Sequence, residues 1–242
     1  MTDLTAFIII AFSALIHASF QLSISMLTLL SSHTIGRKRS RQRILLLTSA
    51  FSLGVIIMTI LLLSLFAQAT TAFVESTDQL ILAWTIGCGL LMGVGVAVWL
   101  FYYRRQLGTS LWVPRSFARF ISVRTKRTQQ SAEAFSLGLT SVVAELLFII
   151  APLSIAAIAL THLSPSSQLL GIAMYGLISL SPLIFITLSI NGGTSISRIQ
   201  KWREANKSFL QFAAGSGLVV LGFYIYVEEV ITQSVMAAAG SL

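Results

Sequence analysis

Charged residues are scarce in this chain of 242 residues: 10% of the residues are charged and 55% are hydrophobic. Soluble domains carry about 25% charged residues, so the composition excludes an ordinary soluble domain. The single cysteine, Cys88, lies in an apolar run, which excludes a disulfide framework or a thiolate metal site within one chain. The phosphate-binding GxxxxGK[ST] pattern, HExxH, GxSxG and a pair of membrane-embedded aspartates are all missing. We therefore expect no enzymatic activity, no metal site and no cofactor.

Long apolar runs take the place of these motifs. A helix that spans a bilayer needs about 20 apolar residues, and six runs reach this length. They cover residues 5–30, 44–67, 80–103, 134–161, 169–190 and 208–230. The first run follows no basic segment and is about 25 residues long, which favours a retained span over a cleaved signal peptide. The sequence therefore predicts an all-α polytopic membrane protein with six transmembrane helices.

The basic residues are confined to alternate connections between these runs. All 16 lysines and arginines fall within residues 37–43, 104–127 and 198–207. The positive-inside rule then predicts that these three connections are cytoplasmic and that both termini lie outside. The net charge of +8 is explained by topology, so we do not expect nucleic acid as a partner.

The two halves of the chain resemble each other. Residues 11–31 align without gaps with residues 134–154, and both stretches begin with Ala-Phe-Ser and end with Leu-Ser. Gly-Cys-Gly-Leu at 87–90 similarly resembles Gly-Ser-Gly-Leu at 215–218. Because each half has an odd number of spans, three, the second half enters the membrane from the opposite side. This arrangement is the inverted repeat common in secondary transporters.

This repeat sets the predicted domain organisation. The first three-helix repeat covers residues 1–103 and the second, inverted repeat covers 134–230, with a basic cytoplasmic segment at 104–133 between them and an external tail at 231–242. Gly89 and Gly93 form a small-residue face suited to close helix contact. Whether copies of the chain associate into a homo-oligomer stays open.

The basic segment contains a candidate amphipathic helix. Pro114 suits a first helical position, and apolar residues recur at helical spacing after it. We expect this helix to lie in the plane of the inner leaflet, with the bilayer as its partner. Its lipid-surface residues would be Arg115, Arg119, Arg124, Lys126 and Arg127. The alternative is a solvated basic loop.

Polar residues inside the predicted spans mark the candidate site. Glu145 is the one carboxylate deep in a span, where a charge costs at least about 2.5–3.5 kcal/mol, so it should face protein or water. Ser141 lies one turn before it. The first span carries a polar stripe on one helical face: Ser13, His17, Gln21, Ser25 and Thr28.

If the first and fourth spans cross at the pseudo-two-fold axis, His17, Gln21 and Glu145 meet near the midplane. A histidine and a carboxylate there are suited to exchanging protons near neutral pH. Ser25 and Ser141 would help to line the solute and proton path. The alternative is a hydrogen-bonded cluster that only fixes the register of the helices.

Prolines lie inside two spans of the second half. Pro152 is in the fourth span and Pro182 is in the fifth. Because proline removes a helical hydrogen bond, we expect both helices to kink. Ordinary packing irregularity is the competing interpretation.

Six spans in two inverted triplets resemble the lysine-exporter (LysE) superfamily, which includes the CcdA/DsbD thiol-electron carriers. The likeness is carried by residues 11–31 with 134–154 and by residues 207–227, which look like the last span of CcdA-type proteins. CcdA-like proteins have a Pro-Cys setting in spans one and four. Here Pro152 stands without a cysteine, which excludes thiol-electron transfer. The resemblance implies a transporter in a bacterial cytoplasmic membrane, with amino acids, metal ions or other small solutes as substrates.

The sequence thus favours an integral membrane secondary transporter or exporter of a small molecule or ion, coupled to protons and working by alternating access. The alternative is a membrane scaffold or subunit that docks a partner through its basic cytoplasmic segment. A membrane enzyme that acts on lipid lacks a recognisable acid–base or metal set.

The predicted topology is testable by cysteine labelling in a Cys88→Ser background. An impermeant maleimide should label cysteines introduced at external positions and not those at cytoplasmic positions, because the basic connections stay inside. The external set is Ser76, Ser166 and Ser241, and the cytoplasmic set is Ser40 and Ser197. The reverse pattern would contradict the orientation.

Overall fold

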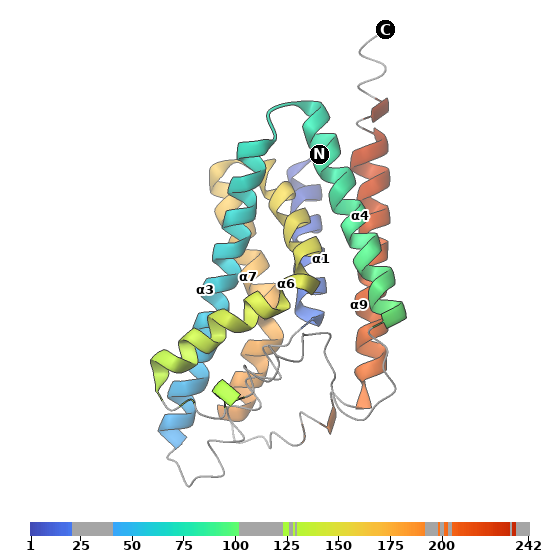
Figure 1. The fold of residues 1–242 in the computed structure, drawn as a ribbon. Helices are drawn as coiled ribbons and strands as arrows, with labels where there is room; N and C mark the ends of the chain where they lie inside the picture. The colour runs from blue at the N-terminus through green and yellow to red at the C-terminus, as the bar shows by residue number, and fades with distance from the viewer. Residues whose placement is uncertain are drawn as a thin grey trace.

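A computed structural model describes residues 1–20, 41–101, 123–125, 128, 130–191, 198, 201–202, 205–232 and 234–235. These residues form six α-helices and one short π-helix, with no strand among them. The helices are α1 (Asp3–Ser19), α3 (Arg41–Phe73), α4 (Thr77–Phe101), α6 (Ser131–Thr161), α7 (Pro165–Asn191) and α9 (Lys207–Ile225), and α9 continues into η1 (Tyr226–Ile231) (Figure 1). The prediction of an all-α protein is confirmed.

Five helical stretches of the described residues are long and apolar enough to cross a membrane. They lie in α3, α4, α6, α7 and the continuous α9–η1 helix. The first predicted span differs, because α1 has 17 residues and the rest of that span, to residue 30, lies outside the described residues. The chain is therefore a helical membrane protein, and the sixth span stays a prediction.

Local hydrogen bonds determine where several helices begin. At α1, the Thr2 hydroxyl accepts a hydrogen bond from the Thr5 amide at 3.2 Å, as expected of an N-cap. Before α4, the Ser76 hydroxyl accepts from the Gln79 amide, and the Gln79 side chain accepts from the Ser76 amide at 3.1 Å. This reciprocal capping box makes the turn between α3 and α4 short and well defined.

Successive helices run in opposite directions (Figure 1). The helix ends that the three basic connections join therefore lie together at one end of the bundle. The α3–α4 and α6–α7 turns lie at the other end, where α1 begins and α9 ends. This alternation agrees with the sequence, in which every second connection between helices is basic.

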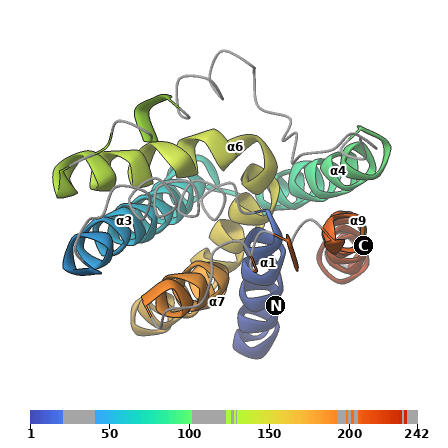
Figure 2. The ribbon, with the colours of Figure 1, turned by 90° about the horizontal axis from the view of Figure 1, so that it is seen from below.

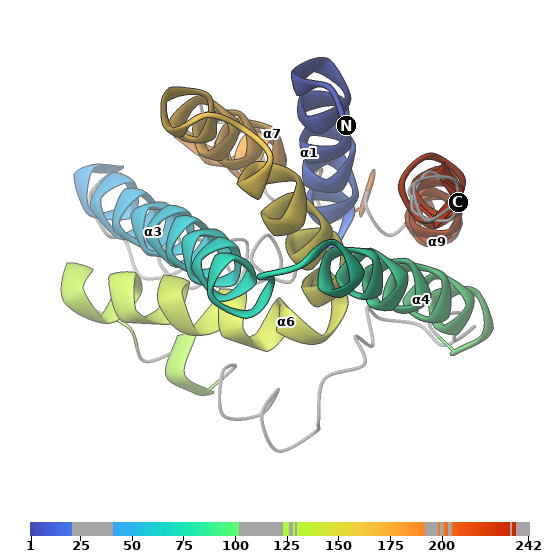
Figure 3. The same ribbon diagram turned by 90° about the horizontal axis from the view of Figure 1, so that it is seen from above.

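Helix α6 lies at the centre of the packing. In its most apolar window 67% of the residues are buried, against 33–39% in the other four spans. It packs against α1, α3, α4 and α7, while α9 pairs with α4 at the side of the bundle (Figures 2 and 3). A helix enclosed in this way can carry polar groups that would be costly against lipid.

Two helices contain an internal proline, and a change of direction is seen in α6. Helix α6 changes direction part-way along its length (Figures 1 and 2), as predicted from Pro152, whose nitrogen cannot donate to the Phe148 carbonyl. In α7, Pro182 likewise cannot donate to the Ile178 carbonyl. The Ser181 hydroxyl donates to that carbonyl instead, at 2.8 Å. The backbone acceptor freed by Pro182 is thus satisfied inside the helix.

Glycines allow the closest helix approach, between α3 and α6. A Cβ atom on Gly54 would collide with the Phe135 carbonyl oxygen, and one on Gly138 would collide with the Phe51 carbonyl oxygen. The predicted close-contact role of Gly89 and Gly93 is wrong within the described chain, because nothing lies within 4 Å of a Cβ at either position. These two glycines lie on the outward side of α4, so their small size serves no contact there.

Of the predicted in-plane helix, only Arg124 among its lipid-surface residues is described, in a helical turn at residues 123–125. Four of its basic residues lie outside the described residues: Arg115, Arg119, Lys126 and Arg127. The in-plane helix therefore stays a prediction.

The α3–α6 crossing generates a stability prediction. We expect Gly138→Ala to lower the free energy of unfolding by about 1–3 kcal/mol, because its methyl group meets a backbone carbonyl that cannot move alone. Gly89→Ala is the matched control, because its methyl group enters open space. Its melting temperature in detergent should stay the same or rise. Equal melting temperatures for the two variants would contradict the close crossing.

Candidate functional site

A buried hydrogen bond links α1 to α7 inside the bundle. The His17 Nδ1 atom lies 2.9 Å from the Tyr175 hydroxyl, and the two rings are tilted with centroids 5.7 Å apart. His17 is 3% exposed and Tyr175 is fully buried. A buried polar pair is tolerated in an apolar interior because each partner satisfies the other. The pair joins the first half of the chain to the second.

Ser13 extends this polar site along α1. It lies one helical turn before His17, so the two side chains share a face. Its hydroxyl is completely buried and has no hydrogen-bond partner among the described residues. A buried hydroxyl without a partner costs about 1–3 kcal/mol, which is a reason to expect a role for it beyond packing.

Glu145 is enclosed by protein, as its position in the sequence predicted. It is 2% exposed on α6, and Ser141, one turn earlier, is fully buried. The Ser141 hydroxyl donates to the Gly138 carbonyl at 2.7 Å, within its own helix. Three residues after Glu145, the Phe148 ring stacks on Phe20 at 5.9 Å between centroids. The end of α1 therefore packs close to the part of α6 that carries Glu145.

The predicted site is only partly contained in the described residues. Gln21 and Ser25 lie outside them, directly after the described end of α1. His17, Gln21 and Glu145 were expected to meet where the first and fourth spans cross. The described residues show that α1 packs on α6, which is the coarser part of this expectation. The hydrogen bond of His17 is made with Tyr175 of α7.

Two features of the site lie beyond what was predicted from the sequence. Tyr175 belongs to the polar residues of the fifth span, and its one-turn spacing from buried Ser179 is the signal that would have identified it. The second feature is a buried hydrogen bond between the Ser52 and Thr187 hydroxyls, 3.1 Å apart, which joins α3 to α7. Ser52 lies one turn after buried Thr48, so the same spacing marks it.

No group of three His, Cys, Asp or Glu side chains in the described part of the chain is arranged to hold a metal ion. The groups available at the site are an imidazole, a phenol, a carboxyl and several hydroxyls. Such a set can hydrogen-bond a polar solute and can take up or release protons.

Five spanning helices with polar side chains enclosed among them define a helical integral membrane protein. No protein-family model, curated protein or solved structure matches the chain. What the protein does has to be inferred from its own residues, and the resemblance to the lysine-exporter superfamily stays a prediction.

The His17–Tyr175 pair predicts a measurable coupling. Tyr175→Phe keeps the ring but removes the hydroxyl, so buried His17 loses its partner and stability should fall by about 1–3 kcal/mol. Tyr224→Phe is the control, because Tyr224 is 37% exposed. In a double-mutant cycle with His17→Leu, the two changes should be non-additive. Additive losses in melting temperature would contradict the pairing.

Proposed function

We propose that the protein is a secondary transporter of a small polar solute or ion, which alternates access around the polar site between α1, α6 and α7. The observation that carries this proposal is the set of buried polar side chains of Ser13, His17, Glu145 and Tyr175, two of them ionisable near neutral pH in water, inside a bundle of apolar helices. Ionisable groups inside a membrane are costly, and they mark solute or proton paths by default.

The depth of these residues supports a site near the middle of the bilayer. His17 lies 14 residues after the start of α1, and Glu145 lies 14 residues after the start of α6. At 1.5 Å per residue both are about 20 Å from helix starts at opposite ends of the bundle. Tyr175 is ten residues, about 15 Å, into α7. The hydrocarbon core is about 30 Å thick, so the positions of His17 along α1 and of Tyr175 along α7 support a site inside it.

The pattern of helix packing supports the proposed inverted repeat. The repeat pairs α1 with α6, α3 with α7 and α4 with α9, and each helix packs against its own counterpart. The α3–α6 contact has its symmetry mate in α1–α7, and α4–α6 has its mate in α1–α9. Paired helices run in opposite directions (Figure 1). A pseudo-two-fold axis in the membrane plane would produce this set of contacts.

In this proposal α6 and α7 supply the moving parts. Both contain a proline, and both contribute to the site, through Glu145 and Tyr175. Rocking of one triplet against the other would break and remake polar contacts such as the His17–Tyr175 hydrogen bond. The basic connections would lie in the cytoplasm and both termini outside, in a bacterial cytoplasmic membrane as the lysine-exporter resemblance implies.

Glu145 would couple protons to transport, with His17 taking part in the relay. We expect Glu145→Gln to keep the fold, because the amide preserves shape and most hydrogen bonds, and to abolish the pH dependence of transport. Glu228→Gln is the matched control, since it removes an equal charge at an exposed position in η1. Transport is measured in proteoliposomes with a pH-sensitive dye, after a resistance and uptake panel in cells has identified a solute.

Melting temperature and transport have to be measured on the same purified variants. A stable and active Glu145→Gln protein with normal pH dependence would contradict proton coupling. No uptake or resistance phenotype for any solute in the panel would favour the alternative, a scaffold that docks a partner through residues 104–133.

A further inference from the structure

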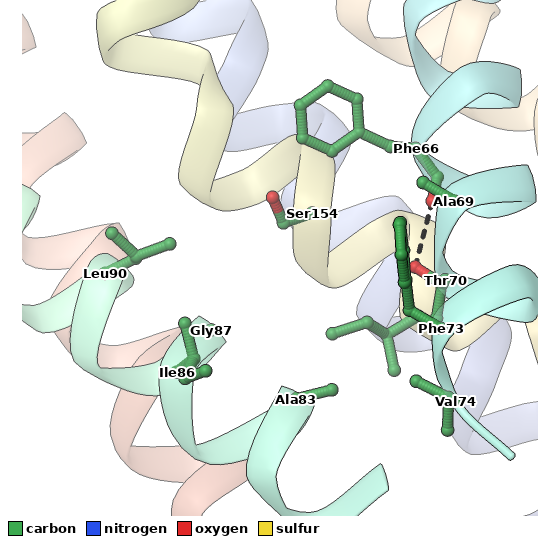
Figure 4. A pocket seen from close by; sticks show the side chains of 11 residues that line it. Phe66, Ala69, Thr70, Phe73, Val74, Ala83, Ile86, Gly87, Leu90 and Ser154 are labelled. Carbon is green, nitrogen blue, oxygen red and sulfur yellow. Dashed lines mark hydrogen bonds between the residues drawn. The ribbon is translucent and has the colours of Figure 1, made fainter. Parts of the chain in front are cut away.

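A cavity lies away from the polar site, between α3, α4 and the C-terminal half of α6. Its volume is about 280 Å³, close to the roughly 300 Å³ at which ligand pockets begin. Figure 4 shows side chains of α3, among them Phe66 and Phe73, facing Ala83 and Leu90 of α4 across the space, with Ser154 of α6 behind. Ser154 is nine residues, a half-integral number of turns, from Glu145, so the cavity adjoins the opposite face of α6.

The chemistry of this cavity fits a hydrocarbon chain. Its lining is almost wholly apolar, and the hydroxyl groups of Thr70 and Ser154 both donate within their own helices. Thr70 donates to the Phe66 carbonyl at 2.9 Å, and Ser154 donates to the Ile150 carbonyl at 2.8 Å. No hydroxyl proton is left for a polar solute, whereas a methylene chain needs none. The cavity is therefore unsuited to the solute of the polar site.

The cavity opens toward the lipid. Phe73 at its edge is 78% exposed and Ile86 is 56% exposed, so the mouth lies between α3 and α4 on the outside of the bundle. Ala83 and Leu90 are six and 13 residues after the start of α4, or about 9 to 20 Å below the turn. That depth is where the acyl chains of one leaflet lie.

The turn above the cavity is acidic. Val74 lines the cavity, and the adjacent Glu75 is exposed, as is Asp78 in the first turn of α4. No lysine or arginine occurs between residues 44 and 103. A headgroup seated on this turn meets negative charge, which favours an ammonium group and disfavours a net anionic headgroup. Because lipid tails are as apolar as the cavity, the headgroup and the close packing decide which lipid is held.

We propose that this cavity, named here the α3–α4 crevice, binds one acyl chain of a phospholipid with an amine-bearing headgroup, such as phosphatidylethanolamine. The chain lies against Phe66, Ala83 and Ser154, and the ammonium group lies at Glu75 and Asp78. This lipid site requires only that the helices span a membrane, so it stands or falls independently of transport.

Photocrosslinking tests the crevice directly. The full-length protein is reconstituted in phosphatidylethanolamine vesicles with a trace of the same lipid that carries a photoactivatable group on its acyl chain. Labelled peptides should map to residues 66–74 and 83–90. Ala83→Phe fills the crevice and should reduce this labelling about tenfold, because the phenyl ring occupies the space that the acyl chain would take. Ala97→Phe, at an exposed position of the same helix, should leave it unchanged.

Ala69→Phe fills the crevice from the α3 side and should reduce the labelling in the same way. It replaces Ala83→Phe in the comparison if that variant does not fold. Unlabelled phosphatidylethanolamine should compete better than phosphatidylglycerol, and Glu75→Gln with Asp78→Asn should remove that preference. Equal labelling of the wild type, the two filling variants and Ala97→Phe would overturn the site, because it would mean a general lipid shell. Equal or better competition by phosphatidylglycerol would overturn the assignment of the headgroup.

Discussion

The fold depends on one constraint: a long helix that carries a carboxylate has to be kept away from lipid. Helix α6 holds Glu145 and Ser141 in its middle, and the hydrocarbon core offers neither of them a partner. The protein meets this constraint by enclosing α6 with α1, α3, α4 and α7. Enclosure requires close approach, which Gly54 and Gly138 allow where α3 crosses α6. The outer helices can then remain apolar toward the lipid.

The same enclosure divides α6 into two surfaces with different chemistry. The side that carries Glu145 packs near α1, where the Phe20–Phe148 stack and the His17–Tyr175 hydrogen bond hold three helices together. The C-terminal half of α6, between α3 and α4, lines an apolar crevice open to the bilayer. Helix α6 bends part-way along its length. A movement of its C-terminal half would therefore change its contacts both at the polar site and at the crevice.

Much of this architecture follows from the sequence, because apolar length and the distribution of charge are one-dimensional signals. The five described spans, the burial of Glu145 and the bend of the Pro152 helix were all predictable in this way. Side-chain partners were not, because they depend on the rotation of each helix about its axis. The sequence therefore did not identify Tyr175 as the partner of His17. It also predicted a helix contact at Gly89, whereas this residue lies on the outward side of α4. Spacing shows which residues share a face, but only packing shows what that face meets.

The accessibility of Ser13 to water tests the central claim most directly, since a solute path must be wet and a structural cluster is not. In a Cys88→Ser background, the rate at which Ser13→Cys reacts with a small polar thiol reagent is measured from each side of the membrane. The proposed path predicts reaction from one side, at a rate that a bound solute changes. Ala151→Cys, in the apolar core of the same bundle, should stay unreactive. Equal lack of reaction at Ser13→Cys and Ala151→Cys would contradict a transport path through α1, α6 and α7.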